Sequence, residues 1–480
     1  MRFLSLLTCA IFTILPSLTK ASEGTNILWI YVDDMSDWMG CYGHDAVETP
    51  NIDALADVGI RFDRAYMPSA VCSTTRSALI TGTMQTTHGL HRHRTMLKKP
   101  LPEGVFTVPS LFLEAGYTTF NEEKEDYNFA YDREDLFTAD FDRPTMRGHL
   151  IGRDVSFLKQ LQGKAFFGQI QLKGGKFGGE TGSKYPSESR VDPATVHVPA
   201  HYPDTPVMRN AIARHYEQVV ETDEQVGAIV SGLKEYELWD NTIVFFFTDH
   251  GAPLPRSKQF LYEDGTKVPL IVRFPPSMNA PASPGTVRTD LVNGIDISAT
   301  TLALAGLETP ASFEGDDLFA ADYQPKEFTI SARDRCGIAV DRIRAVRTER
   351  FRYIRNYLTD RAFYQSQYRD KFASIIELKE VYEAGNMTPL QASYMSAETR
   401  SGEELYDIEK DPDQLNNLAK DPEYAAVLKQ HREILEEWIE ETDDQGQHMD
   451  SPEELKAVYD YAKGKVEAPE YDFLKKDEAK

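Results

Sequence analysis

Three strongly apolar segments mark the chain, and polar residues follow them. The segments cover residues 26–32, 165–172 and 242–247. A continuous apolar run of this length is typical of a strand that is buried on both faces of a parallel sheet. Asp33 and Asp34 follow the first segment, and Asp249 and His250 lie just beyond the third. Because open α/β sheets bind ligands beyond the carboxyl ends of their strands, this pattern predicts a ligand site at one sheet edge.

Segments with helical periodicity lie between these predicted strands. Apolar residues share one face of a helix predicted over residues 51–61, and a longer helix is predicted over residues 206–233. A short strand at 268–272 and a strand-to-helix unit at 291–307 follow. Strands that alternate with helices predict an α/β fold. We therefore expect residues 22–322 to form an α/β domain, in which helices sandwich a large, mixed and mostly parallel sheet.

The pattern changes near residue 323, where the predicted strands become half-exposed. Residues 343–347 and 351–354 alternate apolar with basic residues, as antiparallel strands with one solvated face do. An amphipathic helix is predicted over residues 424–442. We expect a smaller C-terminal α+β subdomain with an antiparallel sheet over residues 323–445. Residues 446–480 are expected to be a charged tail that forms a loosely attached helix.

The first residues have the composition of a secretory signal. Arg2 precedes an apolar core over residues 3–15, and small residues near Ala21 suit a cleavage site. We therefore expect residues 1–21 to be a signal peptide and the mature protein to be secreted or periplasmic. The apolar core is too short to span a bilayer, so no stable membrane insertion is expected. The structural alternative is a buried first helix.

The charge distribution limits the classes of molecule that the protein is expected to bind. The formal net charge of −24 argues against a general nucleic-acid-binding protein. Against this acidic background, residues 65–102 contain no Asp or Glu. This segment carries several cationic residues, so an anionic substrate is expected to bind there. They are Arg76, Arg92, Arg94, Lys98 and Lys99.

The centre of this positive segment, residues 70–82, predicts a loop that leads into a helix ended by Gly82. Cys72 would lie at the helix N-terminus, where backbone N–H groups and the helix dipole favour an anion. Arg76 lies one turn later, so its guanidinium can return to the same place. For Cys72 alone, the alternative is a buried structural cysteine.

Two predicted strands deliver acidic residues to the same sheet edge. Adjacent carboxylates there are costly unless a cation holds them, although Asp33 and Asp34 alone would also suit an ordinary acidic loop. Together with Asp249 they form a set of three carboxylates, which favours a hard divalent cation such as Ca²⁺. A nitrogen ligand from His250 is less usual for Ca²⁺, so Mg²⁺ stays open.

The motif Cys72-x-x-x-Arg76, followed by residues 77–82, resembles the signature of the type I sulfatases, members of the alkaline-phosphatase-like superfamily. The resemblance implies that a maturation enzyme oxidises Cys72 to formylglycine, whose hydrated aldehyde is the nucleophile. Thr74 departs from the signature, which usually has Pro or Ala there. The resemblance also implies a calcium site formed by Asp33, Asp34, Cys72, Asp249 and His250.

Three further segments carry the resemblance. Residues 116–119 resemble a family strand that leads to an active-site lysine, here Lys124. Residues 124–129 are similar to a bacterial branch near the heparan N-sulfatases. Residues 257–265 are similar to the segment that supplies the sulfate-binding lysine of the family, here Lys258.

The donor of a proton to the leaving group stays open. Lys176 falls where relatives place a substrate-contacting His, and Asp126 stands near Lys124 where many relatives have a second His. A lysine is a poor general acid unless its pKa is lowered. His197 and His201 are therefore alternative donors, or surface histidines.

His250 is similar to the variant of the metal site found in iduronate-sulfatase-like enzymes.

The sequence thus predicts a secreted sulfuric ester hydrolase that acts on O- or N-sulfate groups of a sulfated carbohydrate. Two alternatives remain: a phosphodiesterase or phosphonate hydrolase of the same superfamily, or an inactive sulfated-glycan-binding protein that stays unconverted because of Thr74. The residues expected to be catalytic are Cys72, Arg76, Lys124 and Lys258. Those expected to bind substrate are Lys176, His88, Arg92, His93 and Arg94.

Overall fold

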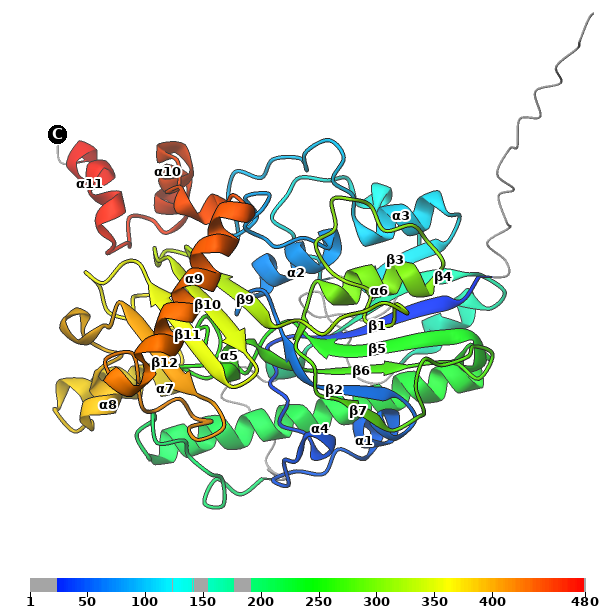
Figure 1. Ribbon diagram of the computed structural model, residues 1–480, viewed down its shortest axis with the longest axis horizontal. Coiled ribbons are helices and arrows are strands. Elements are labelled where there is room, and N and C mark those ends of the chain that lie inside the picture. The colour runs from blue at the N-terminus through cyan, green and yellow to red at the C-terminus, as the bar shows by residue number, and fades with distance from the viewer. Residues whose placement is uncertain (1–23, 123, 140, 142–153, 177–190, 479–480) are drawn as a thin grey trace, which may run out of the picture.

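The computed structural model describes residues 24–122, 124–139, 141, 154–176 and 191–478. The predicted signal peptide lies outside these residues. Within them, the chain forms one large sheet and one smaller sheet (Figure 1). None of the described helices has the length and apolar character needed to cross a membrane.

The large sheet of the described chain has eight strands and is mostly parallel. In sheet order they are β3 (Thr118–Glu122), β4 (Phe166–Leu172), β1 (Asn26–Val32), β5 (Thr242–Thr248), β6 (Lys267–Arg273), β2 (Ile60–Tyr66) and β7 (Thr286–Arg288), with β8 (Val292–Asn293) beside β2. Ile30 of β1 lies between Ile170 of β4 and Phe246 of β5 in parallel register. β6 runs antiparallel to both of its neighbours. The predicted large, mixed sheet is confirmed.

Helices cover both faces of this sheet (Figure 1). One face carries α1 (Pro50–Asp57) and α4 (Pro206–Glu235), and the other carries α2 (Cys72–Thr81), α3 (Val108–Glu114) and α6 (Asp296–Leu304). The central strand explains the sandwich, since Leu28, Ile30 and Val32 pack toward the first pair of helices. Trp29 and Tyr31 pack toward the other three. Because successive side chains of a strand point to opposite faces, an unbroken apolar strand requires cover on both.

One predicted helix is shorter than expected. The apolar pattern favoured a helix over residues 51–61, but α1 ends at Asp57 and Ile60 already begins β2. Gly59 separates the two elements. Ile60 satisfies both the helical face and a strand alternation that continues at Phe62, so periodicity alone placed it in the wrong element.

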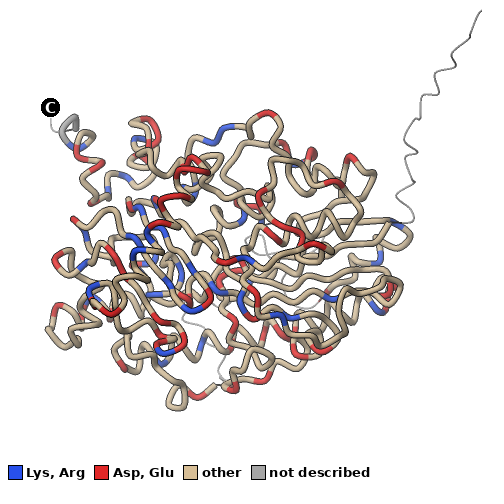
Figure 2. Tube along the Cα trace, in the orientation of Figure 1, with Lys and Arg blue, Asp and Glu red and all other residues tan. Residues whose placement is uncertain are grey.

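The smaller sheet confirms the predicted antiparallel subdomain. Its strands, in sheet order, are β12 (Glu403–Asp407), β11 (Phe351–Asn356), β10 (Ile343–Thr348) and β9 (Phe328–Arg333), and its helices include α7 (Ala373–Glu383), α8 (Pro389–Ala392) and α9 (Ala425–Glu441). Along α9, Leu428 and Leu435 pack against Val346, Tyr353 and Leu405 of the sheet. Figure 2 shows Lys and Arg positions gathered along these strands, as the alternation of apolar and basic residues predicted.

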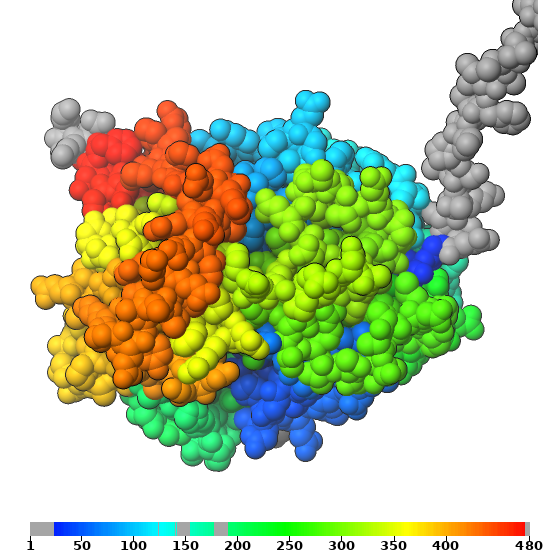
Figure 3. Space-filling view, in the orientation of Figure 1, coloured from blue at the N-terminus to red at the C-terminus, as the bar shows by residue number. Residues whose placement is uncertain are grey.

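The C-terminal tail is not a loosely attached helix, and this prediction was wrong. It forms α10 (Pro452–Tyr461) and α11 (Asp472–Glu478). Leu455, Val458 and Tyr471 are buried in a small apolar cluster together with Ile338 and Val340. Charged residues dominate the composition of the tail, but its few apolar residues fall on one face and suffice to attach it. In Figure 3 the tail lies against the segment that follows α2.

A largely buried carboxylate, with 12% of its side chain exposed, joins the two sheets. Glu263 opens the short helix α5 (Glu263–Thr266), directly before β6. Its Oε1 accepts hydrogen bonds from Arg347 Nε at 2.9 Å and from Arg352 Nε at 2.8 Å, on neighbouring strands of the smaller sheet. Its Oε2 accepts one from the Tyr66 hydroxyl of β2 at 2.9 Å. Burial opposes ionisation of Glu263, but the two guanidinium groups overcome it and lower the pKa to about 2.

Replacing Glu263 by Gln is expected to weaken the junction of the sheets, because removing one partner of a buried ion pair costs ~3 kcal/mol or more. The folded-state pKa of about 2 lies below the ordinary value of 4.5, so this stability is complete above the ordinary pKa. It is lost as the pH falls toward 2. Urea unfolding of wild type and Glu263→Gln, followed by tryptophan fluorescence, should show a difference that shrinks as the pH falls below 4.5.

Glu409→Gln provides the matched control. This carboxylate pairs with Arg350 at 3.7 Å but is largely exposed, so its loss is expected to cost below ~1 kcal/mol. Equal destabilisation by both variants would contradict the assignment of Glu263 as the junction.

Candidate active site

Cys72 is the first residue of α2 and lies at the carboxyl edge of the large sheet. Val71 before it is extended, with φ −150°, and Gly82 ends the helix in the left-handed region, with φ 64°. The predicted loop-to-helix transition is therefore confirmed. The first turn leaves its backbone N–H groups without helical partners, beside a buried thiol.

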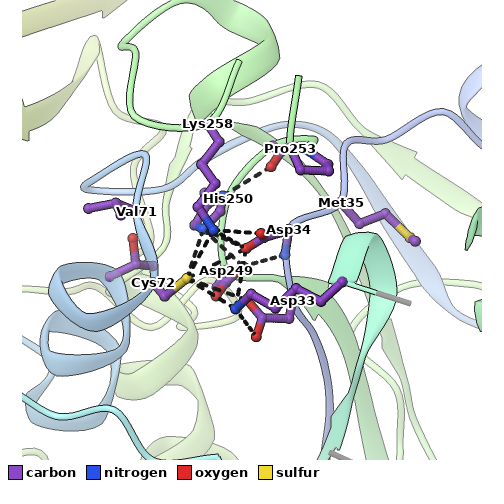
Figure 4. Close-up of polar contacts among 12 residues, drawn as sticks. Asp33, Asp34, Met35, Val71, Cys72, Asp249, His250, Pro253 and Lys258 are labelled. Atoms are coloured by element: carbon purple, nitrogen blue, oxygen red, sulfur yellow. Dashed lines mark hydrogen bonds and ion pairs between the residues drawn. The ribbon is translucent and has the colours of Figure 1, made fainter. Parts of the chain in front are cut away.

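The ends of β1 and β5 bring acidic and imidazole side chains to Cys72 (Figure 4). The Cys72 Sγ lies 3.5 Å from Asp33 Oδ1 and 3.5 Å from Asp34 Oδ1. It lies 3.3 Å from His250 Nε2. The Asp34 backbone N–H donates to Asp249 Oδ1 at 2.9 Å. One ligand atom from each of these five buried residues lies within 4.8 Å of the others, so all predicted metal ligands come together.

His250 is oriented by its own loop. Its Nδ1 lies 3.0 Å from the Gly251 carbonyl oxygen, which can only accept, so Nδ1 carries a proton. Its Nε2 faces Asp34 Oδ1 at 3.1 Å and Asp249 Oδ1 at 3.5 Å. Burial lowers the pKa of His250, but the charges of Asp249 and Cys72 outweigh it and raise the pKa to about 10. Nε2 therefore points at the two carboxylates beside which a cation would bind.

Three lysines converge on the same carboxylates. Lys258 Nζ lies 2.6 and 2.5 Å from the two carboxylate oxygens of Asp34. Lys176 Nζ lies 2.5 Å from Asp33 Oδ2, and Lys124 Nζ donates to that same oxygen. Each lysine comes from a different loop of the sheet edge. The three lysines therefore compensate much of the negative charge that the aspartates concentrate here.

These lysines stabilise an anion at residue 72. Lys258 Nζ and Lys176 Nζ lie 3.4 and 3.5 Å from Cys72 Sγ. Burial raises the pKa of the Cys72 thiol, but the charges of Lys124, Lys176 and Lys258 outweigh burial and lower it below its ordinary value. Burial likewise opposes ionisation of Asp34, yet Lys176 and Lys258 hold its pKa well below the usual range.

Arg76 is fully buried against the cluster. Its Nε lies 3.3 Å from Asp249 Oδ2, and its Nη1 donates to Gln171 Oε1 at 2.7 Å. The guanidinium lies over the Tyr31 ring, 4.3 Å from the centroid. Its Nη2 is buried without a hydrogen bond among the described residues and lies 3.8 Å from Asp33 Oδ2. This nitrogen is the one donor of Arg76 that a bound anion can still use.

The glycine-rich loop explains how Lys176 reaches the cluster. A Cβ at Gly174 would lie 2.2 Å from the Asp33 carbonyl oxygen, and a Cβ at Gly175 would lie 2.0 Å from that of Asp34. The Gly175 N–H donates to the Asp33 carbonyl oxygen at 2.8 Å. Only glycine allows the loop to pass directly over the two aspartates.

Two residues predicted to bind substrate lie beside the cluster. Arg94 Nε is 3.7 Å from Asp126 Oδ1, and Asp126 Oδ2 is 4.0 Å from Lys124 Nζ. His93 is buried, with its Nδ1 3.5 Å from Cys336 Sγ. Burial lowers the pKa of His93 well below its ordinary value, so its imidazole is neutral.

The other histidines and Arg92 have different surroundings. Arg92 pairs with Asp450 and donates to the His448 carbonyl oxygen at 3.2 Å. With His88 it lines a separate cavity of about 360 Å³. His197 is exposed and His201 is buried near Arg256. Among the described residues, none of these four predicted side chains contacts the Cys72 cluster.

Sequence reasoning missed several residues that shape the site. Gln171 and Tyr31 orient Arg76 from inside two buried strands. The polar Gln171 within a buried strand was a usable signal, because such a group needs a partner. Arg369 donates to the Lys258 carbonyl oxygen at 2.9 Å and to that of Leu254 at 3.2 Å, and so fixes the loop that carries Lys258. No local pattern marks Arg369, because its partners lie more than a hundred residues away.

The residues present fit a divalent cation. Three buried carboxylates and an imidazole nitrogen converge, and oxygen ligands are those that Ca²⁺ and Mg²⁺ prefer. The short contacts from Lys176 and Lys258 show that the carboxylates require positive charge at this point. Asp33, Asp34, Asp249 and His250 would hold the ion, beside residue 72.

Comparison with known proteins places this geometry in a family. Residues 25–307 match the family model described as Sulfatase, which is more than half of the chain. The chain belongs to the sulfatase family. Its class is therefore that of the sulfuric ester hydrolases, as the sequence predicted. Residues 256–400 match the C-terminal domain model of N-sulphoglucosamine sulphohydrolase.

Curated relatives cover most of the chain. An ulvan-active sulfatase of Formosa agariphila is 29% identical over 88% of this chain and 75% of its own length. The human N-sulphoglucosamine sulphohydrolase is 28% identical over 91% of this chain and 93% of its own.

Solved structures share the fold. A 2-O GAG sulfatase superposes with a TM-score of 0.64 at 21% identity, covering 90% of this chain and 96% of its own. The phosphonate monoester hydrolase of Agrobacterium radiobacter superposes with a TM-score of 0.62 at 18% identity, covering 87% and 96%. The predicted alkaline-phosphatase-like architecture is thereby confirmed.

Replacing Asp249 by Asn is expected to weaken binding of Ca²⁺ and Mg²⁺ by at least ~10-fold, because it removes one of three carboxylates from a site that needs their charge. Isothermal titration calorimetry with CaCl₂ and with MgCl₂ on protein with unmodified Cys72 measures this directly. Asp45→Asn, which changes an exposed carboxylate outside the cluster, is the control. Unchanged affinity in Asp249→Asn would contradict the cation site.

Proposed function

We propose that the protein is a sulfatase that removes sulfate groups from sulfated glycans. Its nucleophile would be residue 72 after oxidation of Cys72 to formylglycine by a maturation enzyme. The observation that carries the proposal is the buried cluster in which Cys72 meets three carboxylates and three lysines. A sulfate group is a compact anion, and this cluster offers it positive charge from several sides. The names of the two curated relatives, which both refer to sulfated sugars, support the substrate class.

Formylglycine would supply a hydrated aldehyde whose hydroxyl attacks sulfur, and Ca²⁺ or Mg²⁺ would polarise a sulfate oxygen and favour the ionised nucleophile. The chain itself positions these reactants. Lys176 and Lys258 approach residue 72 from opposite loops and neutralise charge that develops as the S–O bond breaks. Arg76 holds Asp249 in place and keeps Nη2 directed at the cluster.

Export of the protein from the cytoplasm would be consistent with a sulfated glycan as its substrate. The predicted signal peptide would deliver the enzyme to the periplasm or the exterior, where polymeric sulfated glycans are found. An O-sulfate and an N-sulfate differ in the sugar atom that leaves. The cluster around residue 72 would contact the sulfate group rather than that atom, so it does not distinguish the two bonds.

Thr74 is relevant to the proposed oxidation of Cys72 by a maturation enzyme, because it lies two residues after Cys72 in α2. Its Oγ1 donates to the Val71 carbonyl oxygen at 3.0 Å and lies 2.8 Å from Ser69 Oγ, so the side chain stabilises the first turn of α2. Proline at this early helical position would be accepted without loss of a helical hydrogen bond. The departure from the family signature therefore changes the segment that a maturation enzyme would recognise, and leaves the fold of α2 intact.

Mass spectrometry of the Cys72 peptide is expected to show the aldehyde in protein from a host with a formylglycine-generating enzyme. Cys72→Ala should then lower sulfate release at least ~10³-fold, because the nucleophile is lost. Thr74→Pro is the matched variant, and it should raise the converted fraction or leave it unchanged. An intact thiol together with full activity would overturn the proposed nucleophile, and an intact thiol with glycan binding but no turnover would favour a binding protein.

Lys176→Ala is expected to lower kcat/KM for 4-nitrophenyl sulfate by ~10²-fold, since it removes one positive partner of the transition state. Lys429→Ala, which changes an exposed lysine on α9, is the control. The fold-level similarity to a phosphonate monoester hydrolase favours bis(4-nitrophenyl) phosphate as the competing substrate. Faster turnover of that diester than of the sulfate would overturn the assignment as a sulfatase.

A further inference from the structure

A cavity of about 740 Å³ lies between the segment after α2 and the C-terminal tail. Its volume is within the range of ligand-binding pockets, about 300–1,000 Å³, and exceeds what one sulfate group needs. Arg94 and Met96 line it on one side, and Tyr368 lines it from the loop before α7. Val458 and Tyr461 of α10 close the other side.

The cavity is connected to the Cys72 cluster by direct contacts. Arg94 at its wall pairs with Asp126, which in turn pairs with Lys124 of the cluster. Tyr368 precedes Arg369, whose Nη2 donates to the Lys258 carbonyl oxygen at 2.9 Å. Arg94 is therefore linked to Lys124 through Asp126, and Tyr368 is next in sequence to the residue that fixes Lys258.

A buried wall residue also presents an unused polar atom. His93 lines the cavity, and its ring centroid lies 5.9 Å from that of Tyr368. Its Nε2 is buried and has no hydrogen bond among the described residues. His93 and Tyr368 therefore form a packed aromatic pair in the cavity wall.

The tail is held in place as a fixed wall. Glu454 of α10 accepts hydrogen bonds from the backbone N–H groups of Met96 at 2.8 Å and Leu97 at 2.9 Å. The same carboxylate accepts from Arg335 Nη2 at 2.8 Å. Figure 3 shows the tail in contact with this segment. The wall is therefore preorganised, which lowers the cost of ordering it around a ligand.

The cavity exposes large apolar side chains together with cationic ones. Met96, Tyr368 and Tyr461 line it and are three of the ten large apolar side chains that are exposed among the described residues. Aromatic faces pack well against the C–H faces of sugar rings. Arg94 and Lys465 supply positive charge at the wall.

The carboxylates of the cavity are already engaged. Glu467 accepts a hydrogen bond from the Ser366 hydroxyl at 2.7 Å, and Asp370 pairs with Lys379 at 2.9 Å. Lys465, in contrast, forms no ion pair with any residue that the structure describes. Lys465 is therefore a cationic group of the cavity wall with which an anionic ligand can pair.

We propose that this cavity is a subsite for the sugar next to the sulfated one, and that the C-terminal tail is the specificity element of the enzyme. Tyr368 and Tyr461 would pack on that sugar, while Arg94 and Lys465 would bind its carboxylate or second sulfate. This inference rests on the proposed function. It makes the substrate an acidic oligosaccharide in preference to a single sulfated sugar. The tail lies beyond both matched family segments, which end at residues 307 and 400.

Binding tests the subsite without turnover. In the Cys72→Ala background, Tyr461→Ala and Lys465→Ala are expected to weaken binding of heparin and ulvan tetrasaccharides at least tenfold by isothermal titration calorimetry. Both side chains are exposed, so the fold should tolerate their loss. Lys456→Ala is the matched control, because it removes the same charge from α10 at an exposed position outside the cavity. An equal effect of Lys456→Ala and Lys465→Ala would overturn the subsite in favour of general electrostatic attraction.

Kinetics separates this inference from the proposed function. The ratio of kcat/KM for a tetrasaccharide to that for 4-nitrophenyl sulfate should fall at least tenfold in Tyr461→Ala. If neither tetrasaccharide binds, the subsite is overturned even when 4-nitrophenyl sulfate is hydrolysed. If tetrasaccharides bind through Tyr461 but no sulfate is released from any substrate, the proposed function fails and the subsite stands.

Discussion

Three carboxylates buried at one sheet edge are the constraint on which the site depends. Burying an ionised carboxylate costs several kcal/mol unless opposite charge and hydrogen bonds compensate it. Asp33 and Asp34 follow β1, and Asp249 follows β5, so parallel pairing of these two strands forces the charges together. Loops that are otherwise unrelated must then supply positive groups at this point. The glycine-rich loop after β4 and the loop before α5 do so with Lys176 and Lys258.

The smaller sheet also helps to position these positive groups. Arg369, in the loop before α7, fixes the backbone of Lys258, and Glu263 connects β6 to the arginines of β10 and β11. The C-terminal subdomain therefore sets the position of a lysine that contacts residue 72. The catalytic cluster and the outer cavity share these supports, since Tyr368 and Arg369 are consecutive residues. Tyr368 is thus one peptide bond away from Arg369, whose side chain holds the backbone of Lys258.

The sequence predicted the sheet and its reactive edge because both follow from local patterns. Unbroken apolar runs identified β1 and β5, and the polar residues at their ends identified the predicted cation ligands. The same reasoning failed where one residue suited two periodicities, as at Ile60, and where long-range contacts decide the outcome, as at Arg369. The attachment of the tail was missed for a similar reason. Its apolar face is short, and the Glu454 contacts that hold it depend on backbone groups far away in the sequence.

A reactive centre of this kind does not by itself select a substrate. A phosphonate monoester hydrolase shares the fold, and a cluster that neutralises a tetrahedral anion serves sulfate and phosphonate by the same electrostatics. Discrimination must then come from groups that contact the rest of the substrate. In this chain the groups proposed for this role lie on the segment after α2, on the loop before α7 and on α10. Glu454 joins α10 to the segment after α2, and Ser366 of the loop before α7 donates to Glu467 of the tail. The third of these lies outside the matched family segments, whereas the cluster around residue 72 lies within them.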